Sequence, residues 1–241
     1  MLKEVFAGST RSRGAVRAPD PAENPLESWY VEHTGRLIHK WTHYFEIYHR
    51  HFSRYRGKRP TVLEVGISHG GSIEMWHDYF GAGCRMFGVD VNPKCKAFEN
   101  AATTIFIGDQ ADRGFLAQLR SELPRIDILI DDGGHTMQQQ IATFEELYPH
   151  VARDGVYLCE DLHTSYWDEF DGGYREPGSF IEYSKAYIDQ LNAWYSRQLD
   201  RLDVNEFTLT THSMHYYNSV LVIEKRPTPR PQDSRRGVPS F

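Results

Sequence analysis

The sequence has few cysteines and no long apolar run. Its three cysteines, Cys84, Cys95 and Cys159, are an odd number with no C-x-x-C pair, which argues against a disulfide framework and a thiolate zinc site. No stretch of about 18 apolar residues occurs, so we expect no membrane-spanning helix and no membrane partner. The first residues also lack the apolar core of a secretory signal. These absences predict a cytoplasmic protein.

Basic charge is also scarce. The formal net charge is −6, from 27 Lys and Arg against 33 Asp and Glu, which argues against a general nucleic-acid partner. The length of 241 residues and 40% hydrophobic content suit one well-packed domain. Arg and Pro are concentrated near both ends. We therefore expect flexible tails at residues 1–25 and 227–241 around a domain at 26–226.

The middle of the chain alternates between strand and helix patterns. Short apolar runs that we interpret as buried strands lie near residues 61–66, 85–92, 103–110, 126–132 and 155–163. Segments of helical character follow each of them, the last being a long helix over residues 179–199. Near-continuous apolar strands that alternate with helices are typical of a parallel sheet covered on both faces.

The two ends of this domain depart from the alternation. Residues 27–54 are rich in aromatics and free of proline, and predict one or two helices within a helical segment at 26–58. Residues 206–225 predict two strands with little between them, hence an antiparallel hairpin at a sheet edge. The predicted fold class is α/β: a Rossmann-like, doubly wound, mainly parallel seven-stranded sheet with a C-terminal antiparallel hairpin and an N-terminal helical segment.

Carboxylates follow every predicted parallel strand. Ligands of open parallel sheets bind beyond the carboxyl ends of the strands, so these side chains share one edge. Helix capping explains one or two such residues, but not a carboxylate at each of five strand ends. The residues concerned are Glu64, Asp90, Asp109, Asp131, Asp132, Glu160 and Asp161.

The first of these turns is rich in glycine. The stretch "EVGISHGGS" has the spacing E-x-G-x-x-x-G and lacks the second glycine of the dinucleotide fingerprint, which makes a nicotinamide oxidoreductase the least favoured enzyme class. Gly66 and Gly70 would let the backbone approach a ligand closely. With Asp90 placed to hold ribose hydroxyls and "GDQ" near an adenine, the pattern indicates a nucleoside-containing ligand.

The stretch "DILIDDGGHTMQQQ" at residues 127–140 has two readings. Asp132 could only cap the helix that begins near Thr136, or it could hold a metal. Three carboxylates with a histidine nearby favour a hard divalent cation, Mg²⁺ with Mn²⁺ as the alternative. A metal that chelates two adjacent hydroxyls lowers the pKa of one of them, and His135 could accept its proton or be an ordinary surface histidine.

Five motifs together resemble a known family: "VLEVGISHGGS", "GVDVN", "GDQ", "IDDGGH" and "EDLHTSYW". They are similar to those of class I S-adenosylmethionine-dependent methyltransferases, and more narrowly of the metal-dependent sugar O-methyltransferases of macrolide biosynthesis. The resemblance covers about residues 40–225. It implies an S-adenosylmethionine- and Mg²⁺-dependent O-methyltransferase that acts on a sugar hydroxyl of a glycosylated natural product.

The resemblance also implies roles for individual residues. Asp132, Glu160 and Asp161 match the metal ligands, and His135 matches the catalytic base. Asp131 is given to the cofactor side or to a structural role. The cofactor set is Glu64, Gly66, Ser68, Gly70, Ser72, Asp90, Asp109, Gln110 and Asp131.

The acceptor side is less defined by the sequence. His163 and Tyr166 are candidates to contact the acceptor, and residues 166–180 form either a mobile loop that closes over it or a plain connection. His215 and Tyr216 either reach the site or pack. Trp41, Tyr44, Phe45 and Tyr48 are interpreted as a core or subunit-interface stripe.

Other functions remain open at this point. A catechol would chelate a metal through two adjacent oxygens, as a sugar diol does. A metal-dependent hydroxylase or hydrolase of antibiotic tailoring could use the same carboxylates, although iron oxygenases usually have two histidines and one carboxylate. A cofactor-binding subunit without activity is the non-enzymatic alternative. Many members of the family have a large N-terminal domain where this sequence has a short segment, so a homo-oligomer in which a second subunit completes the acceptor pocket is also considered.

Overall fold

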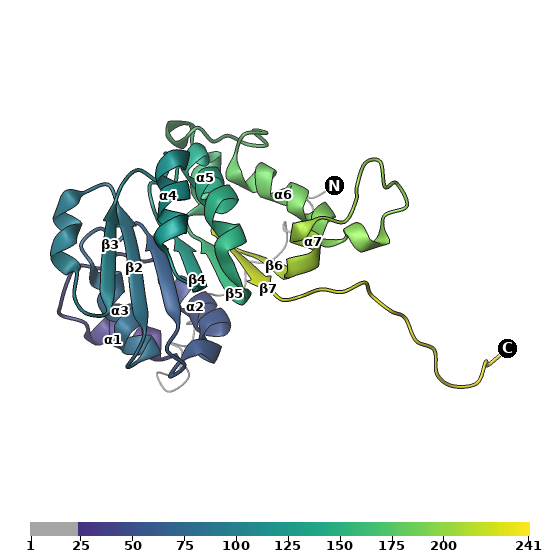
Figure 1. Cartoon of the computed structure of the whole chain (residues 1–241), viewed down its shortest axis with the longest axis horizontal. Coiled ribbons are helices and arrows are strands. Elements are labelled where there is room, and N and C mark those ends of the chain that lie inside the picture. The colour runs from purple at the N-terminus through teal and green to yellow at the C-terminus, as the bar shows by residue number, and fades with distance from the viewer. Residues whose placement is uncertain (1–23) are drawn as a thin grey trace, which may run out of the picture.

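The computed structural model describes residues 24–241. Seven strands form one sheet in the order β3-β2-β1-β4-β5-β7-β6 (Figure 1). The strands are β1 (Thr61–Val65), β2 (Arg85–Asp90), β3 (Thr103–Ile107), β4 (Ile126–Asp131), β5 (Val151–Cys159), β6 (Thr211–Tyr217) and β7 (Val220–Lys225). β1 to β5 are parallel, and β7 pairs antiparallel with β5 and with β6. The predicted fold class is confirmed.

Helices cover both faces of the sheet. Alternate residues of a strand point to opposite faces, so Val62 and Ile128 join the core under one layer, whereas Leu63 and Leu129 join the other. The first layer holds α1 (Pro25–Glu32), α2 (Tyr44–Phe52) and α3 (Gly71–Phe80). The second, with α4 and α5 in front in Figure 1, holds α4 (Arg113–Glu122), α5 (Met137–Leu147), α6 (Phe180–Leu191) and α7 (Glu206–Thr210).

The helices differ from the expectation at several points. α6 ends at Leu191, where Asn192 caps it, and a 3-10 turn η6 (Ala193–Tyr195) follows in place of further helix. Glu206–Thr210 is helical rather than extended, because Asn205 and Thr208 form a capping box that satisfies its first amide groups. Residues 93–98 form a 3-10 helix, η2 (Pro93–Phe98), instead of an α-helix.

The N-terminal segment is helical only in part. α1 and α2 are joined by residues 33–43, which are not helical, and a short 3-10 helix, η1 (Ser53–Tyr55), follows α2. The other 3-10 helices are η3 (Tyr148–His150), η4 (Leu162–Tyr166) and η5 (Asp168–Phe170). The non-helical connection matters for function, since it carries Lys40 and Trp41 to the carboxyl edge of the sheet.

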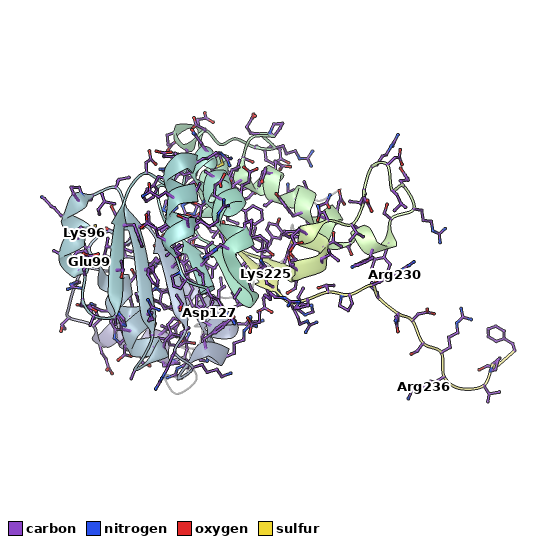
Figure 2. The ribbon with its side chains drawn as sticks, viewed as in Figure 1. Lys96, Glu99, Asp127, Lys225, Arg230 and Arg236 are labelled. Atoms are coloured by element: carbon purple, nitrogen blue, oxygen red, sulfur yellow. The ribbon has the colours of Figure 1, made fainter. Side chains whose placement is uncertain are left out.

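The strand register brings the carboxyl ends of the parallel strands together at one edge of the sheet. Val65 pairs with both Val89 and Asp131, and Asp131 pairs with Cys159, so β1, β2, β4 and β5 end together. Figure 2 labels Asp127 and Lys225, which mark the opposite edge.

Beyond Lys225 the chain has no helix or strand and extends away from the sheet, with Arg230 and Arg236 along it (Figures 1 and 2). The tail expected at residues 1–25 falls almost wholly outside the described part of the chain. Among residues 24–241, none of the helices has the length and apolar character needed to cross a bilayer.

Candidate active site

Three carboxylates meet where β4 and β5 end. Asp132 directly follows β4, while Glu160 and Asp161 directly follow β5. Ligand atoms of Asp132, Asp161 and His135 all lie within 4.8 Å of one another, close enough to share one metal ion. Glu160 is adjacent, with both of its carboxylate oxygens turned to Lys40. Oxygen-rich donors of this kind fit a hard divalent cation.

His135 faces these carboxylates from the loop between β4 and α5. Its Nε2 lies 3.4 Å from Asp161 Oδ2 and 3.9 Å from Asp132 Oδ1, and its buried Nδ1 has no hydrogen-bond partner among the described residues. Burial lowers the pKa of His135 below 6.5, although Asp161 acts in the opposite direction. The imidazole is therefore neutral near pH 7 and can accept a proton.

Lys40 supplies a positive charge that sequence reasoning missed. Its ammonium is hydrogen-bonded to Asp132 Oδ2 and lies 3.0 and 2.9 Å from the two oxygens of Glu160. The side chain is only 3% exposed. Burial alone would lower the pKa of Lys40, but Asp132 and Glu160 raise it well above its ordinary value. No local pattern could reveal this contact, since the partners lie 92 and 120 residues away in the sequence.

The charges of this group do not cancel. An ion pair normally lowers the pKa of its carboxylate, yet the pKa values of Asp132 and Glu160 are raised, first by burial and despite Lys40. One ammonium faces the carboxylates of Asp132 and Glu160, and Asp161 lies beside Asp132 and His135, so acidic groups outnumber basic ones here. A divalent cation bound among them would offset this excess of acidic groups.

Two tyrosine hydroxyls hold the carboxylates in place. Tyr44 and Tyr48 are one helical turn apart on α2, and they donate to Asp161 Oδ1 (2.7 Å) and Glu160 Oε1 (2.6 Å) respectively. Both rings are buried, as expected for a core stripe. The polar role of their hydroxyls was not predicted, because an aromatic stripe looks the same whether or not its hydroxyls have charged partners.

The two loops that carry the site are strained. His135 and Asp161 have φ values of 59° and 55°, in the left-handed region that non-glycine residues rarely occupy. Thr164 ties them together, since its Oγ1 lies 2.9 Å from the carbonyl oxygens of both His135 and Asp161. Strain held by such a link is a frequent feature of active sites.

The alternative role of Asp132 as a helix cap is wrong. α5 is capped by Thr136, which forms a capping box with Gln139. The side chain of Asp132 instead bonds to Lys40. The Asp132 carboxylate therefore does not cap α5.

A cavity of about 180 Å³ opens at the same edge, across the ends of β1 and β2. Of the predicted cofactor residues, Gly66, Asp90 and Gln110 line it. A Cβ on Gly66 would lie 2.0 Å from the carbonyl oxygen of Asp132, so only glycine fits there. The lining is Val65, Gly66, Val89, Asp90, Val91, Gly108, Gln110, Gly133, Gly134 and Gln139.

Asp90 is anchored to the first turn. Its Oδ2 accepts from the amides of Ile67 (3.2 Å) and Ser68 (2.9 Å), and its Oδ1 accepts from Asn92 (2.9 Å). A carboxylate has about four lone-pair positions, so Oδ1 retains capacity for a hydroxyl of a ligand.

The remaining predicted cofactor residues are not among the lining residues. Glu64 is fully buried and accepts from Ser72 Oγ (2.7 Å) and Trp76 Nε1 (3.2 Å), so it braces the start of α3. Gly70 has φ 78° and forms the N-cap of α3. Ser68, with φ 44°, is exposed beside Asp90.

Asp131 and Asp109 also lie off the cavity wall. Asp131 is fully buried, accepts from Gln110 Nε2 (2.8 Å), and has its pKa raised by burial to about 8, which favours the structural role left open for it. Asp109 is exposed, and its Oδ1 accepts from the amide of Ala111 (2.8 Å).

The acceptor candidates differ in their setting. His163 is fixed by Ser219, with its Nδ1 2.6 Å from the hydroxyl, and lies 4.0 Å from Asp161 Oδ1. Tyr166 is exposed at the end of η4. His215 instead packs near His51 and Tyr217, and Tyr216 donates to Ser184 Oγ (3.1 Å), so both have structural contacts.

Known proteins resemble this chain in sequence and in fold. Demethylmacrocin O-methyltransferase of Streptomyces fradiae is 38% identical over 98% of this chain, and mycinamicin VI 2''-O-methyltransferase of Micromonospora griseorubida is 33% identical over 93%. The structure of MycE, a methyltransferase of the mycinamycin biosynthetic pathway in complex with Mg, SAH and mycinamycin VI, matches 88% of this chain with a TM-score of 0.73 at 28% identity. The chain is similar to these sugar O-methyltransferases in sequence, and to MycE in fold.

The extent of the match is uneven. This chain spans 58% and 56% of the two curated relatives and 54% of the MycE chain. No protein-family model matches the sequence. The predicted resemblance and fold are thus confirmed, and both apply to roughly half of each relative's length.

Proposed function

We propose that this protein is an S-adenosylmethionine-dependent, Mg²⁺-dependent O-methyltransferase that acts on a sugar hydroxyl, one of a vicinal pair, in a glycosylated natural product. One observation carries the proposal. A neutral histidine faces an excess of carboxylate charge, next to a glycine-lined cavity at the carboxyl edge of a Rossmann-like sheet. The named activities of the two relatives, O-methylation of demethylmacrocin and 2''-O-methylation of mycinamicin VI, agree with it.

The residues of the cavity suit the methyl donor. Asp90 offers a carboxylate oxygen to the ribose hydroxyls, and Gly66, Gly133 and Gly134 let the backbone approach the cofactor. Gln110 is held in place by Asp131 and Thr143. A sulfonium methyl group needs little activation, so correct placement of donor and acceptor supplies much of the rate enhancement.

The carboxylates suit the metal. Asp132, Glu160 and Asp161 would hold Mg²⁺, which when bound would chelate the two hydroxyls and lower the pKa of the attacking one. Glu160 would bind the metal ion through one carboxylate oxygen after that oxygen loses its hydrogen bond to Lys40. His135 Nε2, beside Asp132 and Asp161, would accept the proton of the attacking hydroxyl.

Calorimetric titration with S-adenosylmethionine and S-adenosylhomocysteine, in Mg²⁺ and in EDTA, tests the cofactor part. We expect binding of both compounds under both conditions, because the cavity and the carboxylates are separate groups of residues. Methyl transfer to glycosides with a vicinal diol should then require Mg²⁺. Failure of both compounds to bind would refute the proposal.

A matched pair of variants tests the metal part. Asp132→Asn should abolish Mg²⁺-dependent turnover while it preserves affinity for S-adenosylhomocysteine. Asp189→Asn, an exposed position on α6, should change neither. Methylation of catechols in place of glycosides would keep the chemistry and change the acceptor class.

A further inference from the structure

Three aromatic rings adjoin the carboxylate group in a row, and we call Trp41, His163 and Trp167 the aromatic row. The ring centroids of Trp41 and His163 are 5.8 Å apart at an interplanar angle of 81°, and those of His163 and Trp167 are 4.7 Å apart at 65°. His163, in the middle, lies 4.0 Å from Asp161 Oδ1. The aromatic row therefore lies directly beside Asp161, one of the proposed metal ligands.

The outer two rings are open to solvent. Trp41 is 53% exposed and Trp167 is 43% exposed, although burying an aromatic side chain is normally favourable. They come from different parts of the chain, Trp41 from the connection before α2 and Trp167 from the residue that follows η4. Two exposed tryptophans that converge on one histidine beside an active site form an apolar surface of the kind that ligands cover.

The row is held in position before any ligand arrives. Ser219 Oγ lies 2.6 Å from His163 Nδ1 and 3.1 Å from its backbone nitrogen. The Trp167 amide donates to the Thr164 carbonyl (3.0 Å), and the Trp167 carbonyl accepts from Gly172 (3.0 Å). The Trp41 carbonyl accepts from the amide of Tyr44 (3.0 Å), which joins it to α2. The His163 ring and the backbone at both tryptophans are therefore held in place, which reduces the entropy lost when a ligand binds.

We propose that the aromatic row is the subsite that binds the C–H face of the acceptor's pyranose ring. The inference rests on the proposed function, because it names how that acceptor is held. Aromatic faces carry partial negative charge and attract the weakly positive C–H groups on one side of a pyranose. A sugar laid against the row places its hydroxyls beside Asp161 and the other carboxylates. Trp41, interpreted from the sequence as part of a core or subunit-interface stripe, and Trp167 are then specificity-determining residues.

Kinetics of Trp41→Ala and Trp167→Ala with a diol-containing glycoside test the subsite. We expect KM to rise by roughly tenfold in each variant, equivalent to about 1.4 kcal/mol, with kcat changed far less, because the rings contact the sugar and not the reacting atoms. Trp→Phe at either position should recover part of the loss. Tyr195→Ala removes another highly exposed aromatic and should leave KM unchanged. Wild-type KM in both tryptophan variants would overturn the proposal.

Direct binding separates this inference from the proposed function. Titration of the glycoside into wild-type protein with Mg²⁺ and S-adenosylhomocysteine should quench tryptophan fluorescence in a saturable way, and Trp41→Ala and Trp167→Ala should weaken that binding. Saturable quenching without methyl transfer would support the subsite and refute the methyltransferase. If the enzyme is active but both substitutions leave its affinity for the glycoside unchanged, the subsite alone is refuted. A changed oligomeric state in light scattering, with unchanged KM, would assign the rings to a subunit contact instead.

Discussion

The ammonium of Lys40 bridges Asp132 and Glu160, two carboxylates at the ends of neighbouring strands. Lys40 and Glu160 are almost fully buried and the Asp132 side chain is 20% exposed, and the hydroxyl of Tyr48 also donates to Glu160. The N-terminal segment thus provides a cation at the carboxyl edge of the sheet. Without Lys40, the carboxylates would lie buried beside one another with no counter-ion among the described residues.

Replacing Lys40 with Met should destabilise the metal-free protein by about 3–5 kcal/mol, since it leaves buried carboxylates unpaired. The free energy of unfolding in EDTA measures this. Mg²⁺ should raise the melting temperature of Lys40→Met more than that of the wild type, because more negative charge is left for it. Lys185→Met, which removes a half-exposed lysine paired with Glu182, is the control. Equal losses for the two variants would contradict the prediction.

Replacing His135 with Ala should lower kcat by about 10²- to 10⁴-fold, the usual contribution of a general base. Affinity for S-adenosylhomocysteine should remain, because His135 is not among the residues that line the cavity. Rapid-quench or steady-state methyl transfer, together with calorimetry, measures both quantities. His212→Ala, at an exposed position of β6, should have neither effect. Unchanged turnover in His135→Ala would exclude it as the base.

Activity should depend on pH through the same residue. His135 must be neutral to accept a proton, and burial lowers its pKa below 6.5. The protonated fraction of His135 rises as the pH falls through this lowered pKa, so kcat/KM should decline toward acid pH with its half-maximal point below pH 6.5. A bound divalent cation would shift the decline further in the acid direction. The residual activity of His135→Gln should lack this acid limb, and a half-maximal point above pH 6.5 would count against His135.

Comparing Gly66→Ala with Gly57→Ala separates the effect of the close approach of Gly66 to Asp132 from the effect of backbone strain. Gly66 and Gly57 have φ values of 88° and 70°, so alanine is strained at either position by about 1–2 kcal/mol. A Cβ on Gly66 would in addition lie 2.0 Å from the Asp132 carbonyl oxygen, whereas nothing lies within 4 Å of one on Gly57. Chemical denaturation should show a clearly larger loss of stability for Gly66→Ala. Affinity for S-adenosylhomocysteine should fall in that variant only. Equal losses of stability and equal affinities in the two variants would show that the backbone moves away from the added Cβ without a measurable loss of stability.

Much of the fold and part of the site could be predicted from local patterns. The apolar runs that became β1 to β5 and the helices between them imply a parallel sheet, and its topology brings Asp132, Glu160 and Asp161 to one edge. His135 could be found because it follows Asp132 by three residues. The helix at Glu206–Thr210 was missed, since its Thr and Leu residues suit a strand and only the capping box of Asn205 decides otherwise.

The sequence by itself determined which chemical groups stand at the strand ends, because strand periodicity and parallel topology depend on local order. The tertiary structure alone decided how those groups are neutralised and oriented. Lys40 reaches Glu160 across 120 residues, and Tyr48 reaches it across 112. A buried charge takes its partner from whatever the packing of distant elements brings near it, and such packing leaves no periodic trace in the sequence.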